Sequence, residues 1–518
     1  MIHGNILFAA TYYVDFGSGS DNNSGTSTTS PWQHAPGMQT CANVCKSTTV
    51  QAGDSIILKG GVTWPNSSFM WSLPGGSAAS PVYIGVDKTW YAGSSWTRPI
   101  LTAGGVAIGN NYDTMFTVPP YVTVDNFAIT GFYWDGTSCS GAPYGDCGIF
   151  NAGQRSGQTF ENLYIHGWTH AGTDASTSSG VIDIFSFGGN GQNVAHDNVI
   201  VGTDVAGDHS VNAFFNGPGT AYNNYIKQVS SGFIVSYGVS FHDNHIEDVG
   251  PAYCNEPFPQ YAGNCSHENG FEDNGDIGLD FYNNVITNVS AGLAIWIAPN
   301  PGYTAYLWNN LIYAVHDNQI LDLTAPVYNP TYCSQGASSN NYCKATGSFV
   351  LWNNTVQCGD DTTQYDCQAG VGTASGQGSV VTALTMQNNH FIDLTGAAAS
   401  CATGSGGPTL CVSVTPNTSQ TQATANGQGY SSTETYAFSP TSSSGATVGA
   451  GTNLTTSATG NLATLASDTT YACTDGNGNQ PSCPARAAIG RASAGAWNAG
   501  AYQSFAPAPP VNLSNVSQ

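Results

Sequence analysis

The chain has 518 residues, only 8% of them charged, and a net charge of −23 with nine Lys and Arg in total. So few basic residues argue against nucleic acid as a partner, because its phosphates need a basic surface, and they disfavour a polyanionic substrate. The apolar content of 40% is ample for a core, and the length corresponds to one large domain or two ordinary ones.

The N-terminal sequence MIHGNILFAATYYVD contains a short apolar stretch that ends in Ala9-Ala10. This stretch is similar to the end of a secretory signal peptide, so we expect residues 1–10 to be a remnant of one. The sequence has no run of about 18 apolar residues, and no membrane span is therefore predicted.

Fourteen cysteines fall into close neighbours along the chain. Their even number and short spacings predict seven local disulfides and an oxidising, extracytoplasmic compartment. The alternative, a metal–thiolate site, usually needs CxxC pairs, which are absent. The predicted disulfides are Cys41–Cys45, Cys139–Cys147, Cys254–Cys265, Cys333–Cys343, Cys358–Cys367, Cys401–Cys411 and Cys473–Cys483.

A repeat runs through the middle of the chain, in segments such as VAHDNVI, TAYNNYI and LDFYNNVI. Each is a short alternating strand, an asparagine and a second apolar strand. The spacings between the asparagines are 36, 26, 20, 40, 26, 44 and 35 residues, and the shortest suit one coil of a β-solenoid. The 40, 44 and 35 spacings each contain a cysteine pair, which indicates loops pinned by disulfides. The anchoring asparagines are Asn162, Asn198, Asn224, Asn244, Asn284, Asn310, Asn354 and Asn389.

A further strand precedes each of several repeats, over residues 181–186, 211–216, 233–238, 271–276 and 293–298. Aligned from their first residues, they place positions one, three and five inward and positions two, four and six outward. Asp183 and Asp273 fall on the inward face, where a carboxylate needs either a partner or a bulge that turns it outward.

Residues 400–470 are rich in Ser, Thr, Gly and Gln, and we interpret them as irregular late coils with long loops. The solenoid itself is expected to span residues 11–503, and residues 504–518 are expected to form a loose tail.

Three segments carry a resemblance to a known family: residues 11–33 with 51–64, the asparagine-anchored coils, and RASAGAWNAGAYQ at 491–503. They resemble the secreted pectate-lyase-like proteins. The resemblance implies an all-β, single-stranded right-handed parallel β-helix (solenoid), here with disulfide-pinned loops, whose asparagines stack in a ladder at one turn. It implies little about function, because this fold hosts lyases, hydrolases, epimerases, tailspikes and adhesins.

The stretch HENGFEDNGD at 267–276 concentrates acids in a chain that has few. Three interpretations stay open: a solvated turn, a calcium site without EF-hand spacing, and a catalytic or glycan-binding site. The catalytic candidates are Glu272, Glu268, Asp208, Asp276, His209 and His267. The candidates for substrate binding are Trp296, Asn212, Asn274 and Phe214.

Coil geometry predicts how these candidates are spaced, because neighbouring coils lie about 4.8 Å apart. Trp296 is expected one coil beyond the acidic strand, level with Asn274. Counted three residues before Val211 and Phe271, Asp208 and Glu268 are expected two coils, or roughly 10 Å, apart. Inverting glycosidases hold their carboxyl groups about 6.5–9.5 Å apart, a separation that Glu272 is expected to reach with Glu268 or with Asp208.

We therefore expect a secreted glycoside hydrolase that cleaves a neutral or weakly charged polysaccharide or cell-surface glycan, with no required cofactor and with calcium possible. One alternative is a cation-assisted polysaccharide lyase, whose base is typically Lys or Arg. Only Arg155 and Lys227 are available in the middle of the chain, and Lys227 is better explained as a surface lysine. A second alternative is a non-catalytic adhesive or filament-forming solenoid, for which self-association is expected.

The histidines of the repeat region sit in or beside the asparagine turns. Hydrogen bonding within these turns explains them better than catalysis does. They are His166, His170, His196, His242, His245 and His316.

Overall fold

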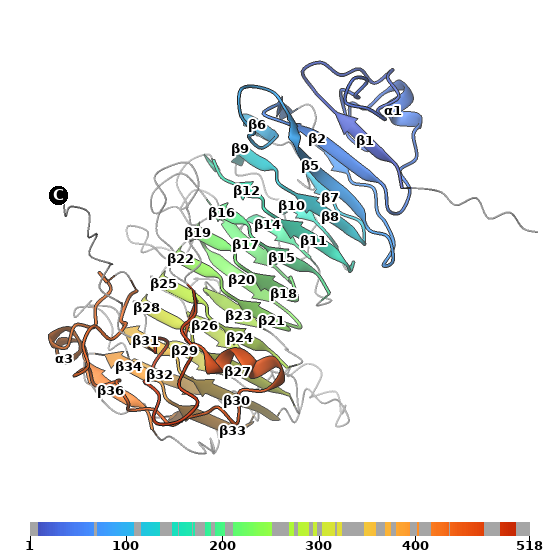
Figure 1. Cartoon of the computed structure of the whole chain (residues 1–518). Coiled ribbons are helices and arrows are strands. Elements are labelled where there is room, and N and C mark those ends of the chain that lie inside the picture. The colour runs from blue at the N-terminus through green and yellow to red at the C-terminus, as the bar shows by residue number, and fades with distance from the viewer. Residues whose placement is uncertain are drawn as a thin grey trace, which may run out of the picture.

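The computed structural model describes residues 9–66, 70–107, 115–134, 148–153, 155–167, 169–170, 182–187, 192–202, 211–250, 269–273, 278–289, 294–297, 303–315, 319–323, 346–358, 368–373, 380–393, 401–403, 416–434, 436–470 and 487–503. Within these residues, short strands stack along one axis and so form three long sheets (Figure 1).

The three sheets are named A, B and C, and their strands are given in spatial order. Sheet A has twelve strands: β1 (Thr11–Val14), β2 (Ser55–Gly60), β5 (Val82–Tyr91), β8 (Val122–Asp125), β11 (Gln158–Glu161), β15 (Val194–His196), β18 (Thr220–Tyr222), β21 (Ser240–His242), β24 (Asp280–Tyr282), β27 (Thr304–Trp308), β30 (Thr346–Trp352) and β33 (Val380–Gln387).

Sheet B has thirteen strands: β3 (Thr63–Trp64), β6 (Ile100–Ala107), β9 (Ala128–Trp134), β12 (Tyr164–Ile165), β16 (Val199–Val201), β19 (Tyr225–Val229), β22 (His245–Val249), β25 (Val285–Val289), β28 (Leu311–Val315), β31 (Thr355–Cys358), β34 (His390–Asp393), β36 (Thr418–Thr421) and β13 (Thr169–His170), which pairs with β9. Sheet C has eleven: β4 (Trp71–Ser72), β7 (Phe116–Thr117), β10 (Gly148–Asn151), β14 (Ile182–Ser186), β17 (Val211–Phe215), β20 (Ser231–Val235), β23 (Phe271–Asp273), β26 (Ile295–Ile297), β29 (Gln319–Leu323), β32 (Gln368–Thr373) and β35 (Cys401–Thr403).

Successive strands of the central coils go to sheets A, B and C in turn, so each coil contributes one strand to each sheet. The coil made of β18, β19 and β20, for example, lies on the coil that precedes it and under the one that begins with β21, and all these pairings are parallel. The predicted fold, a parallel β-helix, is confirmed. Each coil buries its apolar face against its neighbours, as expected for a solenoid.

The turn from sheet A to sheet B holds a row of asparagines that are buried in every coil but the last, where Asn417 is half-buried. The side-chain amide of each donates to the Oδ1 atom of the asparagine on the next coil, over 2.9–3.1 Å. The backbone N–H of each residue also donates to that Oδ1 atom, for example over 3.1 Å from Asn244 to Asn284. The row comprises Asn198, Asn224, Asn244, Asn284, Asn310, Asn354, Asn389 and Asn417.

Two details of this row differ from the prediction. Asn162 is not part of it: its φ of 55° places it in the left-handed position one residue earlier, where Asp197 lies on the next coil. Leu163 occupies the equivalent place in the row, and its N–H donates to Asn198. Asn417, which lies in the segment expected to be irregular, continues the row by one coil. Asparagine tolerates both positions, because its short side chain can adopt positive φ as well as bridge coils.

Inside the solenoid, phenylalanines of sheet C form a continuous stack. Neighbouring ring centroids lie 4.6–4.9 Å apart, with planes within 16° of parallel. The stack comprises Phe116, Phe150, Phe185, Phe214 and Phe233. Because the rings are buried and packed face to face, the stack fixes which face of each strand points inward.

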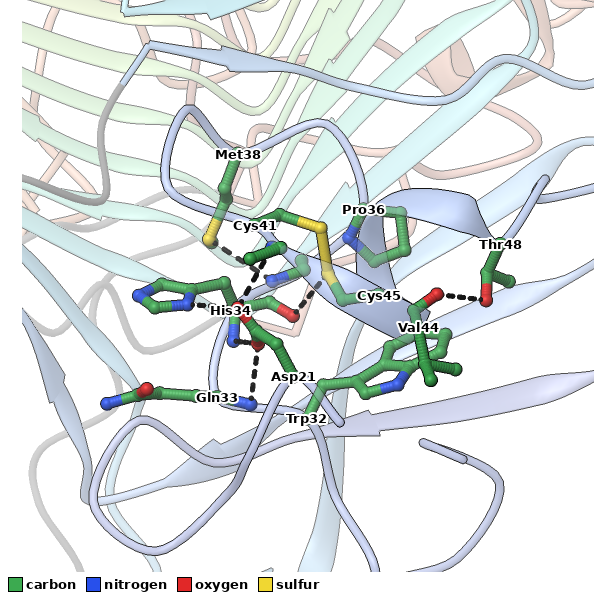
Figure 2. The surroundings of a disulfide bond; sticks show 12 residues. Asp21, Trp32, Gln33, His34, Pro36, Met38, Cys41, Val44, Cys45 and Thr48 are labelled. Carbon is green, nitrogen blue, oxygen red and sulfur yellow. Dashed lines mark hydrogen bonds and ion pairs between the residues drawn. A yellow bond between two sulfur atoms is a disulfide. The ribbon is translucent and has the colours of Figure 1, made fainter. Parts of the chain in front are cut away.

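A cap closes the N-terminal end of the solenoid, around the helix α1 (Asn43–Ser47). The Cys41–Cys45 disulfide lies in this cap, as predicted (Figure 2). The nearby Asp21 carboxylate accepts hydrogen bonds from the backbone N–H groups of His34 (2.9 Å) and Ala42 (3.1 Å). Each of the other six predicted cysteine pairs has at least one member outside the described residues, so they remain predictions.

The C-terminal segment folds back along the last coils, where the orange and red ribbon crosses β27 and the strands beyond it (Figure 1). Its 3-10 helix η5 (Gly460–Ala466) covers sheet A, and the Thr464 hydroxyl lies 3.0 Å from Nε1 of the buried Trp308. Its helix α3 (Gln422–Gly427) and the following residues pack on sheet B, where Tyr430 and Phe438 join Leu311. These segments thereby cover sheets A and B near the C-terminal end of the solenoid.

Arg491 joins this segment to the solenoid. Its guanidinium donates to Asn309 Oδ1 over 3.1 Å and to the backbone carbonyls of Asn498 and Gly500. Among the described residues, no helix has the length and apolar character needed to cross a membrane.

Candidate functional site

The neighbouring strands β20, β23 and β26 of sheet C bring together two of the predicted site residues, Glu272 and Trp296. Phe233, Phe271 and Ile295 pair in register and are buried in the core. Side chains alternate along a strand, so the next residues, Glu272 and Trp296, project from the opposite, outward face. The prediction that these two residues share an outward face on adjacent coils is confirmed.

Glu272 lies on β23 and is only 5% exposed. Its Oε2 atom accepts a hydrogen bond of 2.9 Å from the side-chain amide of Asn269, which is itself 3% exposed. The backbone N–H of Asn269 donates in turn to the Ser231 hydroxyl oxygen over 3.3 Å, on the preceding coil. A carboxylate so removed from water needs such donors, because burial disfavours an unpaired charge.

Trp296 lies on β26 and is half-buried. It pairs in register with Glu272 rather than with Asn274, so its predicted level is wrong by two residues. The reason is that the first residues of the two segments are not level: Ile295, and not Leu293, pairs with Phe271. A shift of two residues conserves the face, which is why the outward position of the indole was still predicted correctly.

The predicted alignment of β17 is wrong by three residues, and this reverses its faces. Phe214, not Val211, pairs with Phe233. Phe214 is fully buried in the aromatic stack, 4.7 Å from Phe185 and 4.8 Å from Phe233 between ring centroids. Its predicted role in substrate binding is therefore wrong. Burying this apolar ring in the core stabilises the fold, whereas exposing it to water would not.

Asn212 is two residues from Phe214 and lies on the same inward face. It is buried, and its amide donates to Asp183 Oδ1 over 2.9 Å. Asp183 thus has the partner that its predicted inward position required. The predicted outward position of Asn212 is therefore wrong, and with it the geometric basis for a role in sugar binding. Asp273, also expected inward, is completely buried between Val235 and Ile297.

Asp183, Asn212 and Ser231 pair in register at the start of their strands, and Asn269 follows on the next coil. We name these four residues the B–C corner row. The side-chain amide of its last member, Asn269, donates to Glu272.

The remaining predicted site residues lie outside the described residues: Asp208, His209, His267, Glu268, Asn274 and Asp276. The expected separation of Asp208 and Glu268 assumes that Val211 and Phe271 occupy equivalent positions on their strands. They do not, since Phe271 pairs with Phe233 and Phe233 pairs with Phe214.

Sheet A carries a second outward row, whose members are not among the predicted site residues. It begins at Glu161 and continues with stacked rings whose centroids lie 4.4–5.1 Å apart with planes within 9° of parallel. The row comprises Glu161, His196, Tyr222, His242, Tyr282 and Trp308. Each member from His196 onward lies two residues before an asparagine of the ladder, a signal that the repeat itself contains.

The histidines of this row are paired with nearby carboxylates. His196 contacts Glu161 Oε2 through Nε2 (2.8 Å) and Asp197 Oδ2 through Nδ1 (2.7 Å). Burial lowers the pKa of His196, but the hydrogen bonds to Asp197 and Glu161 outweigh it and raise the pKa to about 9. His242 contacts Asp243 in the same way, over 2.7 Å. The interpretation of these two histidines as partners within the asparagine turns is confirmed.

Lys227 lies on sheet B, where its Nζ atom is 3.1 Å from Glu247 Oε1. His245 Nε2 contacts the other oxygen of Glu247 at 3.0 Å. Burial raises the pKa of Glu247, but the bonds from His245 and neighbouring side chains outweigh it and lower the pKa to about 2. This arrangement supports the interpretation of Lys227 as a surface lysine.

Within the described ranges, no group of three or more His, Cys, Asp and Glu side chains is arranged to hold a metal ion. Two of the acids proposed for a calcium site, Glu268 and Asp276, fall outside those ranges, so calcium stays an expectation.

The solved structures that match this chain share little of its sequence. A lacto-N-biosidase of family GH136 from Eubacterium ramulus is 14% identical (TM-score 0.39), with 74% of this chain and 64% of that chain covered. The pectate lyase Pel9A is 15% identical (TM-score 0.42), with 96% and 97% covered. The XylC protein in complex with xylose is 10% identical (TM-score 0.41), with 74% and 83% covered. No family model and no curated protein matches the sequence.

Proposed function

We propose that this protein is a secreted carbohydrate-active enzyme that hydrolyses a neutral or weakly charged polysaccharide on the outward face of sheet C. The observation that carries the proposal is the register of β23 with β26, which sets the nearly buried Glu272 beside the half-buried Trp296. A carboxyl group supplies the proton transfers that glycoside cleavage needs. An indole beside it offers an apolar surface to a sugar ring.

Hydrolysis of a glycosidic bond uses two carboxyl groups. One gives its proton to the oxygen of the leaving sugar, and the other removes a proton from water. The water oxygen bonds to the anomeric carbon as the glycosidic C–O bond breaks, so the products together contain one added water. Glu272 is assigned as one of the two groups. Glu268, Asp208 and Asp276 are the candidates for the other, His209 and His267 for tuning it, and Asn274 for holding a sugar.

Charge supports a neutral substrate. The chain has nine basic residues in 518, and Lys227 is engaged with Glu247 on sheet B rather than near Glu272. An anionic polymer would therefore meet little positive charge on the described surface of sheet C. The Cys41–Cys45 disulfide supports an oxidising compartment outside the cytoplasm.

A panel of polysaccharides, assayed for reducing-sugar release with and without a chelator, tests this function. We expect at least one neutral glycan to be cleaved by the wild type, and Glu272→Gln to lower the rate at least about a hundredfold. Glu161→Gln is the matched control, since it makes the same change in an outward carboxylate of sheet A, and it should retain most of the activity.

Full activity in Glu272→Gln would overturn the assignment. Ultraviolet absorbance from a new double bond in the product would indicate a lyase instead of a hydrolase. Binding of a glycan without any product would favour the non-catalytic alternative.

A further inference from the structure

The bond from Asn269 to Glu272 differs from the amide bonds of the asparagine ladder and of Asn212. The ladder asparagines donate to the asparagine of the next coil, and Asn212 donates across strands to Asp183. Such bonds tie coils together. The Asn269 amide instead donates to a carboxylate three residues later in its own coil, so this bond adds nothing to the pairing of strands.

Asn269 is also held from the preceding coil. Its backbone N–H donates to the buried Ser231 hydroxyl, and its carbonyl accepts from the N–H of Gly232 over 3.1 Å. With its backbone anchored at both groups and its side chain 3% exposed, the amide is pre-oriented toward Glu272. A donor in this position acts on Glu272 in two ways: it selects one orientation of the side chain, and it favours the ionised form.

We infer that Asn269 is a positioning residue for Glu272, and that it keeps this carboxylate ionised and oriented despite its burial. The inference rests on the proposed function for its catalytic meaning. It also narrows the role of Glu272: an ionised carboxylate removes a proton or bonds to the anomeric carbon, so the proton for the leaving sugar comes from the other carboxyl group.

The ionisation of Glu272 can be measured without a substrate. The chain has only six glutamates, so their carboxyl carbons can be followed by NMR after selective ¹³C labelling, and Glu272→Gln assigns the signal. In Asn269→Ala, the midpoint of the Glu272 titration should rise by about one pH unit. In Asn269→Asp, which keeps the shape but replaces the donor with a second carboxyl group, it should rise further. An unchanged midpoint in both variants would overturn the inference.

Asn193→Ala is the matched control. Asn193 is 1% exposed, and its amide donates to the Arg155 carbonyl over 3.1 Å, so its truncation removes a comparable buried bond away from Glu272. It should lower the melting temperature as Asn269→Ala does, while leaving the titration of Glu272 unchanged. A shift in Asn193→Ala as large as in Asn269→Ala would show a general effect of destabilisation and would also overturn the inference.

Activity separates this inference from the proposed function. On a glycan that the wild type cleaves, Asn269→Ala should lower kcat about 10- to 100-fold with KM within about threefold, and the acidic limb of the pH profile should move upward. If Glu272→Gln abolishes activity while Asn269→Ala retains the wild-type kcat and profile, the function stands and the inference fails. If Glu272→Gln is fully active but the titration still shifts, the positioning stands and the function fails.

Discussion

The two corners that flank sheet B both carry buried polar rows, but the rows differ in kind. The A–B corner repeats asparagine through eight successive coils, and each side chain is bonded to the next. The B–C corner row changes from Asp183 to Asn212, Ser231 and Asn269, and its last member turns to a carboxylate. A uniform row maximises bonding between coils, whereas the mixed row gives up that regularity where Glu272 lies. Such local departures from a repeat are expected at functional sites.

The outward faces of sheets A and C repeat this contrast. On sheet A, the stacked rings continue under the C-terminal segment, and the two histidines of the row are paired with carboxylates of the row or of the following turn residue. On sheet C, Trp296 is half-buried beside Glu272. Tryptophans on neighbouring coils, Trp296 and Trp308, therefore have different roles, which depend on what covers them.

The largest effect should come from removing a covered indole. Trp308 is fully buried against Leu454, Leu465 and Trp497, so Trp308→Ala should lower the free energy of unfolding by about 3–5 kcal/mol, measured by denaturant unfolding. Trp296→Ala should cost less than half as much, and should weaken binding of a cleaved glycan about fivefold or more by calorimetry. Equal losses of stability in the two variants would remove the distinction between the faces.

A smaller loss of stability is expected in the asparagine ladder. Asn284→Ala removes the bonds of this amide to Asn310 Oδ1 and to the Phe241 carbonyl, and it removes the Oδ1 atom that accepts from the backbone and side chain of Asn244. The free energy of unfolding should fall by about 2–4 kcal/mol. Asn22→Ala, at an exposed turn position of the N-terminal cap, serves as the control and should stay within about 0.5 kcal/mol of the wild type. A ladder variant as stable as this control would show that the uniform row is not what joins the coils.

The smallest effect concerns pH and the His196 cluster on sheet A. The folded-state pKa of His196 is raised to about 9, since its bonds to Asp197 and Glu161 outweigh its burial. A raised pKa contributes stability that is fully present below the unfolded value of about 6.5 and is lost as pH rises through about 9. The melting temperature of the wild type should therefore fall by about 1–3 °C more than that of His196→Gln between about pH 6 and pH 10. Parallel curves for the two proteins would contradict a structural role for this cluster.

The repeat allowed the faces of β23 and β26 to be predicted, but not those of β17. In FEDNGD and LAIWIA one parity is clearly the more apolar at its start, so Phe271 and Ile295 were assigned inward correctly. VNAFFN has adjacent phenylalanines, Phe214 and Phe215, and either parity buries one of them. Only the stack with Phe185 and Phe233 decides that Phe214 is inside.

The sequence by itself determined the coil: the recurring asparagine, its spacing and the alternating strands define a parallel solenoid, because each of these is a local property of one coil. The Cys41–Cys45 disulfide could be predicted for the same reason, since four residues separate its members. The tertiary structure alone decided the register between coils, the partner of Glu272 and the cover over Trp308. These depend on which strands meet in space, and a shift of one or three residues reverses a face without changing the local pattern at all.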